Sequence, residues 1–273
     1  MTKKNETQNA SKATGTLIEF HAERGRIGKT TASNRVRDGY EDRDARVFMI
    51  RIESRNGAPM ARSSDIRIYT EDLADSQNQI GGGAAVAAPL WDSMKAVSRD
   101  GGVVIIDWPA GSTKARLELL ASTSLATKAT AMGLRCISVA VTTTDATVVR
   151  QCAQSLMDTK EVAPEMERVV IVNEISGGPI ARIPPLSEQG QAWTELVAAS
   201  RGLPMVQFPL IRNRGWELFE SRGIEMREVL RTSAEDLAAR LETDPFIVEA
   251  CRTAVAAWWS KTETDLEKVC LFR

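Results

Sequence analysis

The sequence is poor in the side chains that most often perform nucleophilic catalysis or bind transition metals. Its 273 residues include one histidine, His21, and four cysteines. With a single histidine, neither a Ser-His-Asp nor a Cys-His mechanism has the groups it needs, and we expect His21 to be a strand-end residue. The cysteines stand at positions 136, 152, 251 and 270 without paired spacing, which disfavours a metal site or disulfide framework and favours reduced thiols.

Long apolar runs and a surplus of one charge are also missing. We find no run long enough to cross a bilayer and no signal-peptide pattern, which together with the free thiols predicts a cytoplasmic protein. The formal net charge is -1, so the chain as a whole has no electrostatic attraction for nucleic acid. Contact with DNA would therefore need a local basic patch. The length suits one large α/β domain with a sizeable core.

One short stretch near the N-terminus carries the clearest chemical signal. It reads Arg24-Gly25-Arg26-Ile27-Gly28-Lys29-Thr30-Thr31, between a strand-like run at 16–21 and a helix start at 32–37. Glycines let backbone N–H groups turn into a loop, and the helix N-terminus adds donors and positive charge, which favours phosphate binding. Lys29 would reach the terminal phosphates and the Thr30 hydroxyl would ligate Mg²⁺. The strict P-loop pattern is not met, because it requires glycine at Glu23, and a surface turn with an incidental lysine is the alternative.

Strand-like and helix-like segments alternate along the chain. We predict strands at residues 16–21, 47–53, 66–69, 103–107, 134–141, 169–173 and 204–208, and helices at 89–97, 113–131, 145–157, 188–200 and beyond about 214. This alternation predicts an α/β fold with a mostly parallel sheet between two layers of helices. We assign 1–14 to a flexible tail, 15–231 to a P-loop NTPase domain, and 232–273 to a helical extension packed on it.

Polar side chains end three of the predicted strands, namely Glu53, Asp107 and Asn173. In a parallel sheet, ligands bind at the carboxyl ends of the strands, where the phosphate loop also lies. A carboxylate at Asp107 could hold Mg²⁺ through a water, and the amide of Asn173 could both donate to and accept from a purine. The alternatives are a capped turn after a core strand at Asp107 and a turn-opening residue at Asn173.

Two of these stretches resemble sequence boxes of the ParA/MinD family of ATPases. The family's deviant Walker A box, Lys-Gly-Gly-Val-Gly-Lys-Thr-Thr, is matched at Gly25, Gly28, Lys29, Thr30 and Thr31. The run Asp107-Trp108-Pro109-Ala110-Gly111 resembles the family's Asp-x-Pro-Ala-Gly box. Asn173 and the run Phe208-Pro209-Leu210-Ile211 are similar to the asparagine and the last strand and loop that meet the base in the family. The resemblance covers roughly Thr16 to Gly223.

The resemblance implies ATP and Mg²⁺ as cofactors and a homodimer that forms on nucleotide binding. It places the metal at Thr30 and Asp107. The nucleotide-binding residues would be Gly25, Arg26, Ile27, Gly28, Lys29, Thr30, Thr31, Asn173 and Pro209. The catalytic residues would be Lys29, Glu53, Asp107 and Arg24.

The chain departs from the family at three places. Arg24 replaces a lysine that crosses the dimer interface, and we hypothesise that Arg24 contacts the partner's nucleotide in trans. Arg26 replaces a glycine, so it either crowds the loop or adds a phosphate contact. On the second strand the family has Asp-x-Asp, whereas this chain has Arg51-Ile52-Glu53, which keeps one carboxylate and reverses the other charge. Because hydrolysis is sensitive to shifts of about an ångström, slow or absent turnover is an open alternative.

Arginines gather after the last predicted strand. Arg212, Arg214 and Arg222 would contact DNA phosphates without reading bases, if the resemblance extends to DNA binding. Glutamates are interleaved with them, so a solvated helix with internal ion pairs is the alternative.

The C-terminal segment has apolar residues at helical spacing, including Val248, Val255 and Trp258. Glu263 and neighbouring acids make the segment acidic, which disfavours membrane binding. We expect this helix to pack on the domain or to bind a partner.

These observations favour a ParA/MinD-like ATP-binding protein with weak ATPase activity. It would act as a nucleotide-switched dimer in DNA segregation, plasmid stability or conjugative transfer, in the branch that includes StbB-like and TraL-like proteins. Non-specific DNA and a small adaptor protein would be its partners. The alternatives are a nucleotide-bound scaffold that does not hydrolyse and a small-molecule P-loop kinase, for which we see no clear lid or acceptor pocket.

Overall fold

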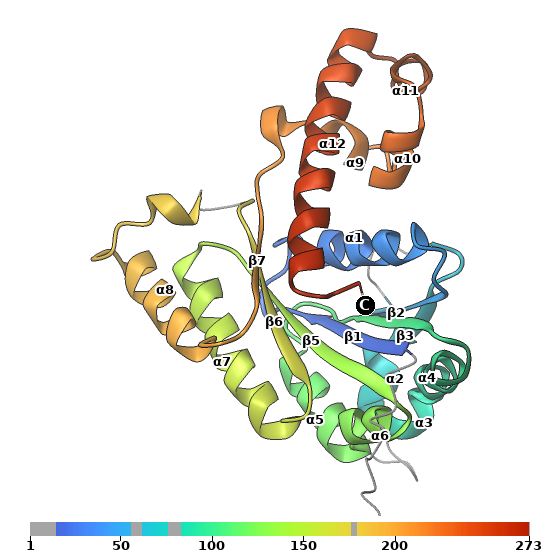
Figure 1. Cartoon of the computed structure of the whole chain (residues 1–273), viewed down its shortest axis with the longest axis vertical. Coiled ribbons are helices and arrows are strands. Elements are labelled where there is room, and N and C mark those ends of the chain that lie inside the picture. Colours follow the sequence, from blue (N-terminus) through green and yellow to red (C-terminus); the bar gives the residue numbers. More distant parts are fainter. Residues whose placement is uncertain (1–14, 56–61, 76–82, 176–178, 273) are drawn as a thin grey trace, which may run out of the picture.

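The structure is a computed structural model, and it describes residues 15–55, 62–75, 83–175 and 179–272. The predicted tail at 1–14 lies outside the described residues. Within them, the chain forms a seven-stranded sheet with strand order β3-β2-β4-β1-β5-β6-β7 (Figure 1). All adjacent strands pair in parallel. The strands are β1 (Gly15–His21), β2 (Val47–Glu53), β3 (Ile66–Tyr69), β4 (Gly102–Asp107), β5 (Leu134–Thr142), β6 (Glu167–Asn173) and β7 (Met205–Phe208).

Helices cover both faces of this sheet, which confirms the predicted three-layer α/β fold (Figure 1). One face is covered by α1 (Lys29–Glu41) and α12 (Pro245–Lys268), and α9 (Glu217–Glu220), α10 (Met226–Arg231) and α11 (Ala234–Leu241) adjoin α12. The other face carries α2 (Thr70–Asp75), α3 (Gly83–Val86), α4 (Ala88–Asp100), α5 (Thr113–Thr123), α6 (Leu125–Ala131), α7 (Ala146–Val162) and α8 (Glu188–Ala199). Two short 3-10 helices are η2 (Ile180–Arg182) and η3 (Arg212–Arg214).

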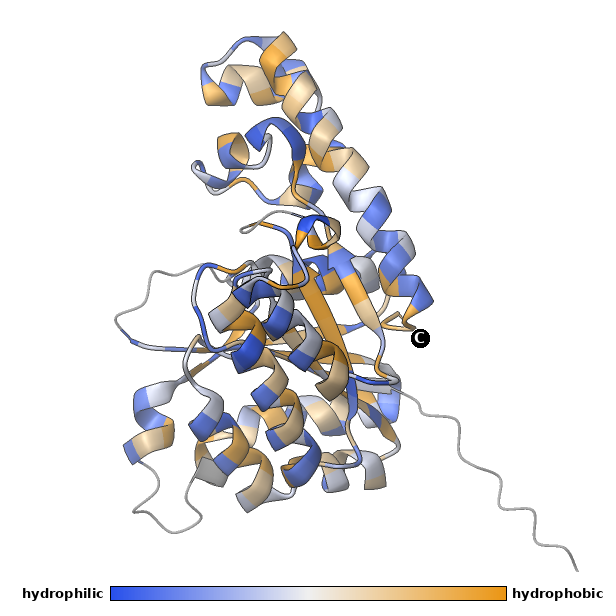
Figure 2. Cartoon of the chain, turned by 90° about the vertical axis from the view of Figure 1, so that its left-hand side faces the viewer, coloured by the Kyte–Doolittle hydropathy of each residue, from blue (hydrophilic) through white to orange (hydrophobic). Residues whose placement is uncertain are grey.

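The core lies on both sides of the central strands. In β4, Val103 and Ile105 pack toward α1, whereas Val104 and Ile106 pack toward the opposite helices, and all four are fully buried. A strand that is buried on both faces reads as a continuous apolar run, which is why β4 was predictable from sequence. Figure 2 shows hydrophobic strands enclosed between helices whose blue residues lie mainly on the outside.

One predicted helix is wrong in its continuity. The segment 113–131 forms two helices, α5 and α6, because Ser124 adopts a left-handed conformation with φ 50°. The backbone N–H of Ser124 turns back to the carbonyls of Ala121 and Leu120, which closes α5. Glycine is the residue that usually signals such a break, and the segment 113–131 contains none, so the break could not be predicted from the sequence.

The C-terminal segment forms the longest helix described, α12, of 24 residues. Its inward face contains the predicted apolar residues Val248, Val255 and Trp258, which are buried. Its second half is fastened to α1, because Arg35 donates to the Thr262 hydroxyl at 3.1 Å and pairs with Glu263. The helix α12 thus packs on the rest of the chain, as predicted. The domain boundary after residue 231 stays a prediction. In the described residues, every helix is too short or too polar to traverse a lipid bilayer.

Candidate functional site

The loop between β1 and α1 has the backbone shape that the sequence predicts. Gly28 is left-handed, with φ 82°, and its carbonyl accepts the first bond of α1 from Ala32 N–H at 2.9 Å. A Cβ at Gly28 would lie 2.0 Å from Nδ2 of Asn173, so both the conformation and the packing require glycine. Helix α1 begins at Lys29, three residues earlier than predicted, and its N-terminal N–H groups therefore face the loop.

Arg26 occupies the loop position where the family has glycine, and its role in nucleotide binding stays a prediction. It adopts φ 60°, a left-handed conformation that costs a residue with a side chain about 1–2 kcal/mol. Its side chain is exposed and lines the cavity described below. The loop therefore accommodates arginine in place of glycine without being crowded by it.

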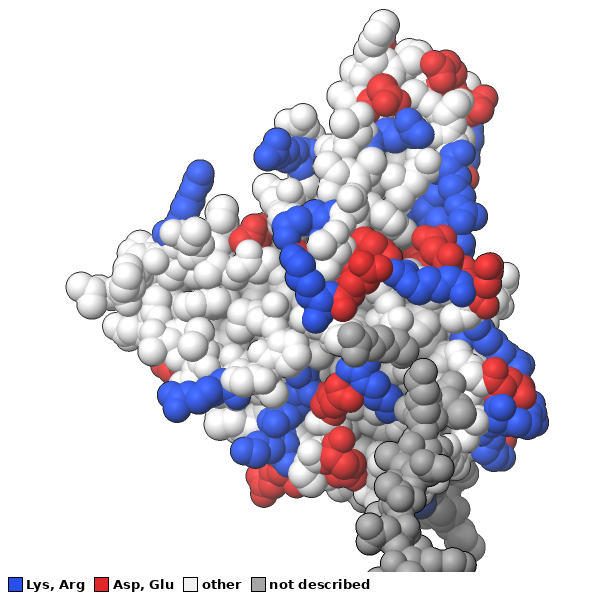
Figure 3. Space-filling view, viewed as in Figure 1, with Lys and Arg blue, Asp and Glu red and all other residues white. Residues whose placement is uncertain are grey.

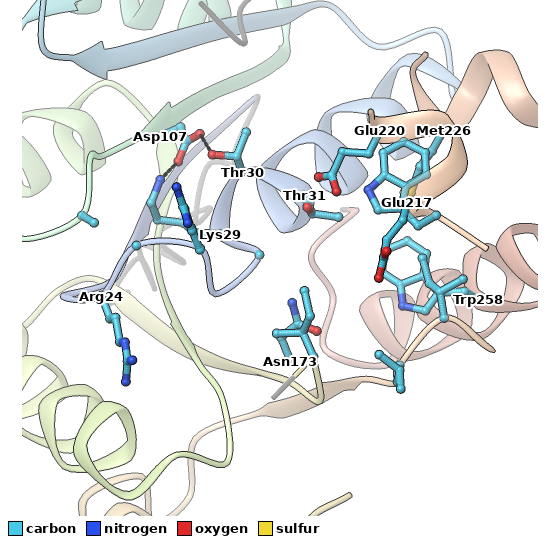
Figure 4. Close-up of a pocket in the computed structure, with 18 of the residues that line it drawn as sticks. Arg24, Lys29, Thr30, Thr31, Asp107, Asn173, Glu217, Glu220, Met226 and Trp258 are labelled. Atoms are coloured by element: carbon cyan, nitrogen blue, oxygen red, sulfur yellow. Dashed lines mark hydrogen bonds and ion pairs between the residues drawn. The ribbon is translucent and has the colours of Figure 1, made fainter. Parts of the chain in front are cut away.

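Lys29 and Thr30 meet Asp107 beside the loop (Figure 4). The Lys29 ammonium pairs with Oδ1 of Asp107, and the Thr30 hydroxyl donates to Oδ2 at 3.1 Å. The strand register explains the meeting, because β4 lies next to β1 and Asp107 stands opposite Phe20, just before the loop. The structure thus brings together three residues that the sequence analysis placed in one site.

Arg51 joins this cluster, and sequence reasoning did not anticipate its contact. It lies opposite Asp107 in the parallel pairing of β2 with β4, and its Nη1 contacts Oδ2 of Asp107 at 2.5 Å. The same guanidinium pairs with Oδ2 of Asp65 at 3.2 Å, donates to the Ser33 hydroxyl at 3.3 Å, and donates to Asn34. Arg51 is 4% exposed, so these contacts hold it in place.

The electrostatics of Asp107 follow from its two cationic neighbours. Burial alone would raise the pKa of the Asp107 carboxyl, but the charges of Lys29 and Arg51 and the hydrogen bonds of Lys29 and Thr30 hold that pKa below its ordinary value. Asp107 is therefore an anion whose two oxygens are both engaged by protein donors.

The donors around Asp107 leave neither of its carboxylate oxygens free for a direct bond to Mg²⁺. Mg²⁺ requires oxygen ligands in near-octahedral array and usually takes one or two carboxylates. In the described part of the chain, no cluster of three or more His, Cys, Asp or Glu residues could hold a metal. Asp107 is already paired with Lys29 and Arg51, and the Thr30 hydroxyl points at it. The metal assignment to Thr30 and Asp107 stays a prediction, and no step is assigned to Mg²⁺.

Glu53 lies at the end of β2 and lines the same cavity. Its Oε1 is 3.6 Å from Nε of Arg67 on β3, and its side chain is 22% exposed. The cluster around Asp107 is thus formed without a contact from Glu53 in the described structure, and the catalytic assignment of Glu53 stays a prediction.

Asn173 and Pro209 lie on the other side of the loop, at the carboxyl ends of β6 and β7. The Asn173 amide donates to the backbone carbonyl of Ile27 at 3.0 Å, and this hydrogen bond links the end of β6 to the loop. Figure 4 shows Asn173 below the loop, facing the space that separates Lys29 from Trp258. Base recognition by Asn173 stays a prediction, and positioning of the loop is its contact in this structure.

The loop opens into a cavity of about 760 Å³, within the roughly 300–1,000 Å³ of small-molecule sites. Besides the loop, Asp107, Asn173 and Pro209, its wall includes Trp216, Glu217, Glu220, Met226 and Trp258 from the C-terminal helices (Figure 4). The indole N–H of Trp216 is buried and has no hydrogen-bond partner among the described residues. The sequence analysis assigned none of these five residues to the nucleotide site, although all but Trp258 lie within the predicted P-loop NTPase domain at 15–231.

Arg24 lies at the edge of the cavity and points away from Lys29 and Asp107 (Figure 4). Its side chain is 59% exposed and pairs with Asp145 at 3.5 Å. An exposed pair of this kind contributes little to stability, so Arg24 can exchange Asp145 for another partner at small cost. Contact with nucleotide in trans stays a prediction.

The predicted DNA-binding arginines are on the surface. Arg212, Arg214 and Arg222 are exposed, and Arg214 pairs with Glu217 at 2.5 Å. On the face shown in Figure 3, basic and acidic side chains stand side by side over the C-terminal helices. DNA binding through these residues stays a prediction.

His21, the last residue of β1, belongs to a buried polar network with residues of β5 and α7. Its ring lies 3.1 Å from the Ser138 hydroxyl and 3.2 Å from the Ser155 hydroxyl. Burial lowers the pKa of His21 well below its usual range, and the charges of Arg116 and Lys29 add to this. His21 is therefore a neutral core residue at physiological pH, as expected for a strand-end histidine without a catalytic role.

The structure is a three-layer α/β fold with a parallel sheet and a glycine-containing turn between β1 and α1. No family model matches the sequence, and no curated protein matches it. Solved structures that match include the MinD cell division protein of Aquifex aeolicus, 15% identical over 90% of this chain and 97% of that chain, with a TM-score of 0.47. A ParA family ATPase from Chlorobium tepidum is 12% identical over 90% and 98% of the two chains, with a TM-score of 0.48.

A plasmid partition protein from Borrelia burgdorferi is 9% identical over 71% of this chain and 90% of that chain, with a TM-score of 0.42. All three TM-scores lie below 0.5, so these similarities do not show to which family this chain belongs. At such low identities the likeness concerns the fold and transfers no activity.

Proposed function

We propose that this protein binds a nucleoside triphosphate, ATP by the resemblance of its loop to the ParA/MinD family, and works as a nucleotide-switched dimer. The observation that carries the proposal is the meeting of Lys29 and Thr30 with Asp107 beside a left-handed glycine turn at the start of α1. Phosphates would displace Asp107 from the Lys29 ammonium and accept hydrogen bonds from the N-terminal N–H groups of α1.

The rest of the cavity suits the nucleoside part of such a ligand. Its apolar wall, with Trp216, Met226 and Trp258, offers a surface on which a flat base can lie. The unpartnered N–H of Trp216 is a donor that a base or ribose oxygen would satisfy. Because these residues come from the C-terminal helices, an occupied cavity would couple those helices to the phosphate loop.

Dimerisation and partner binding are the further parts of the proposal. Arg24 at the cavity edge is the group that would reach a second copy, since its pair with Asp145 is exposed. Arg212, Arg214 and Arg222 would contact DNA phosphates once the dimer aligns two such surfaces. The biological role would be DNA segregation, plasmid stability or conjugative transfer, with a small adaptor protein as a second partner.

A second candidate, a nucleotide-bound scaffold that does not hydrolyse, is favoured by Arg51. Its guanidinium occupies Oδ2 of Asp107, where a metal-linked hydrolytic site needs an available carboxylate. Turnover at saturating ATP, measured together with the rate of nucleotide release, separates the two candidates, because the switch requires one of these steps and the scaffold requires neither.

The test of nucleotide binding uses the full chain, Lys29→Ala and a matched control, Lys95→Ala, whose side chain is 62% exposed on α4. Fluorescent ATP-analogue titrations should show Lys29→Ala weakened by about 10- to 100-fold, since a charge-assisted hydrogen bond contributes about 1.5–3 kcal/mol. Lys95→Ala should bind like the unmodified chain. The fold should survive in Lys29→Ala, because Arg51 still pairs with Asp107. Equal binding by both variants would exclude this loop as the site.

A further inference from the structure

We propose that Arg51 takes the place of a metal ion at Asp107, so that this protein binds its nucleotide without needing Mg²⁺. The inference rests on the proposed nucleotide site and concerns how that site neutralises charge. In P-loop proteins generally, a divalent ion between the loop hydroxyl, the strand-end carboxylate and the phosphates screens two sets of negative charge from each other. Here a side chain of the protein already stands beside that carboxylate.

The contacts place the guanidinium where such an ion would act. The Thr30 hydroxyl and Nη1 of Arg51 both approach Oδ2 of Asp107, at 3.1 Å and 2.5 Å. The other oxygen, Oδ1, is held by Lys29. When Lys29 turns to a phosphate, Asp107 keeps Arg51 as its counter-charge, so the carboxylate does not repel the incoming anion.

Arg51 is fixed in this position by more than its pair with Asp107. Asp65, which accepts from Nε of Arg51 at 3.2 Å, is itself 1% exposed in its side chain and accepts from the backbone N–H of Arg62 at 3.1 Å. Asn34 on α1 accepts from the remaining nitrogen, Nη2. A planar guanidinium with partners on all sides is pre-organised, unlike a hydrated ion that must be bound and partly dehydrated.

Charge counting opposes a second cation at the same place. Lys29 and Arg51 bring two positive charges, and Asp107 and Asp65 bring two negative charges, so the cluster is balanced by the protein's own side chains. A divalent ion against Oδ2 of Asp107 would stand next to the buried guanidinium of Arg51, and like charges repel strongly in a poorly solvated site. Both oxygens of Asp107 are therefore engaged by protein donors before any ion arrives, and Arg51 supplies the counter-charge.

The experiment measures the affinity of the full chain for a fluorescent ATP analogue, with excess Mg²⁺ and with excess EDTA. We expect the two affinities to agree within about threefold, a difference of about 0.7 kcal/mol. A loss of more than about tenfold in EDTA would overturn the inference while leaving the nucleotide site intact. Absence of binding under both conditions would refute the proposed function itself, and this inference with it.

Two variants of Arg51 complete the test. Arg51→Gln should lose about tenfold or more of its affinity in EDTA and regain part of it with Mg²⁺, whereas Arg51→Lys should keep most of the metal-free affinity. The matched control is Arg46→Gln, a half-exposed arginine paired with Asp100 just before β2. Unchanged metal-free binding by Arg51→Gln would overturn the inference. If circular dichroism shows that Arg51→Gln does not fold, Arg51→Lys and the metal dependence of the unmodified chain decide the question.

Discussion

A buried ion pair between Glu19 and Arg116 anchors the loop that follows β4. Loss of this pair should remove a large part of the free energy of unfolding. Glu19 on β1 is 1% exposed, and its carboxylate accepts from Nη1 of Arg116 at 2.6 Å, from Nε1 of Trp108 at 2.9 Å and from the Ser138 hydroxyl at 2.8 Å. Trp108 directly follows Asp107, so this network fixes the chain at the candidate phosphate site. Replacing Glu19 by leucine leaves the fully buried Arg116 without a counter-charge.

The magnitude follows from these contacts. Removing one partner of a buried pair costs about 3–5 kcal/mol, and an unsatisfied indole N–H adds about 1 kcal/mol or more. Glu19→Leu should therefore cost about 4–6 kcal/mol of a total stability of about 5–15 kcal/mol. Arg116→Leu should cost about 3–5 kcal/mol. The double variant should cost about 3 kcal/mol less than the sum, because no uncompensated charge is left buried.

Urea denaturation followed by circular dichroism measures this cycle. A control cycle on Arg150 and Glu188, a largely exposed pair at 2.9 Å, should give a coupling energy below about 1 kcal/mol. Additive costs for Glu19→Leu and Arg116→Leu would show that the buried pair does not couple, and the reasoning from burial would be refuted.

Three further results are expected. Gly28→Ala should lower the free energy of unfolding by about 2 kcal/mol and weaken nucleotide binding, because a side chain at this left-handed position is strained and would displace Asn173. An unchanged urea midpoint and an unchanged affinity would contradict this prediction. The pKa of Asp107 is lower in the folded state than in the unfolded state. Its contribution to stability is therefore present above the unfolded pKa of about 4 and is lost as the pH falls through the lower folded value. Asp107→Asn should accordingly be less stable than the unmodified chain at neutral pH, with a difference that shrinks in acid, and a pH-independent difference would oppose the assignment. Burial raises the pKa of Cys152 to about 12, so its thiol should react slowly. Maleimide should therefore label the partly exposed Cys270 first in the native protein, as followed by mass spectrometry. Labelling of Cys152 before Cys270 would contradict this prediction.

The sequence predicts the central strands and the phosphate loop for a physical reason. A continuous apolar run such as 103–106 is typical of a strand buried on both faces, and a glycine turn before a helix start presents N–H groups that suit an anion. The meeting of Lys29 with Asp107 could be expected as well, because both lie at carboxyl ends of parallel strands or just after one.

The role of Arg51 could not be predicted in the same way. Whether its side chain meets Asp107 depends on the strand order, which makes β2 a neighbour of β4, and on the register that sets Arg51 opposite Asp107. A shift of one residue would have turned Arg51 to the other face of the sheet. The sequence alone therefore shows that Arg51 reverses a charge of the family pattern. Its contact with Asp107 becomes visible only when the pairing of β2 with β4 is known.

The cavity wall from the C-terminal helices was also beyond sequence reasoning. The helical spacing of Val255 and Trp258 predicts a buried face, but not what that face meets. In the structure Trp258 packs edge-on against Phe208 at the end of β7, with ring centroids 5.3 Å apart, and so closes the cavity opposite the phosphate loop. Such long-range contacts depend on how α12 folds back over the sheet.

The most direct measurement is a crystal structure of the full chain with a non-hydrolysable ATP analogue. It should show the β- and γ-phosphates in the turn of residues 25–31, with the Lys29 ammonium moved from Asp107 to a phosphate oxygen and Arg51 still paired with Asp107. A nucleotide bound elsewhere, or a loop that keeps Lys29 on Asp107 at saturating ligand, would contradict the proposed site.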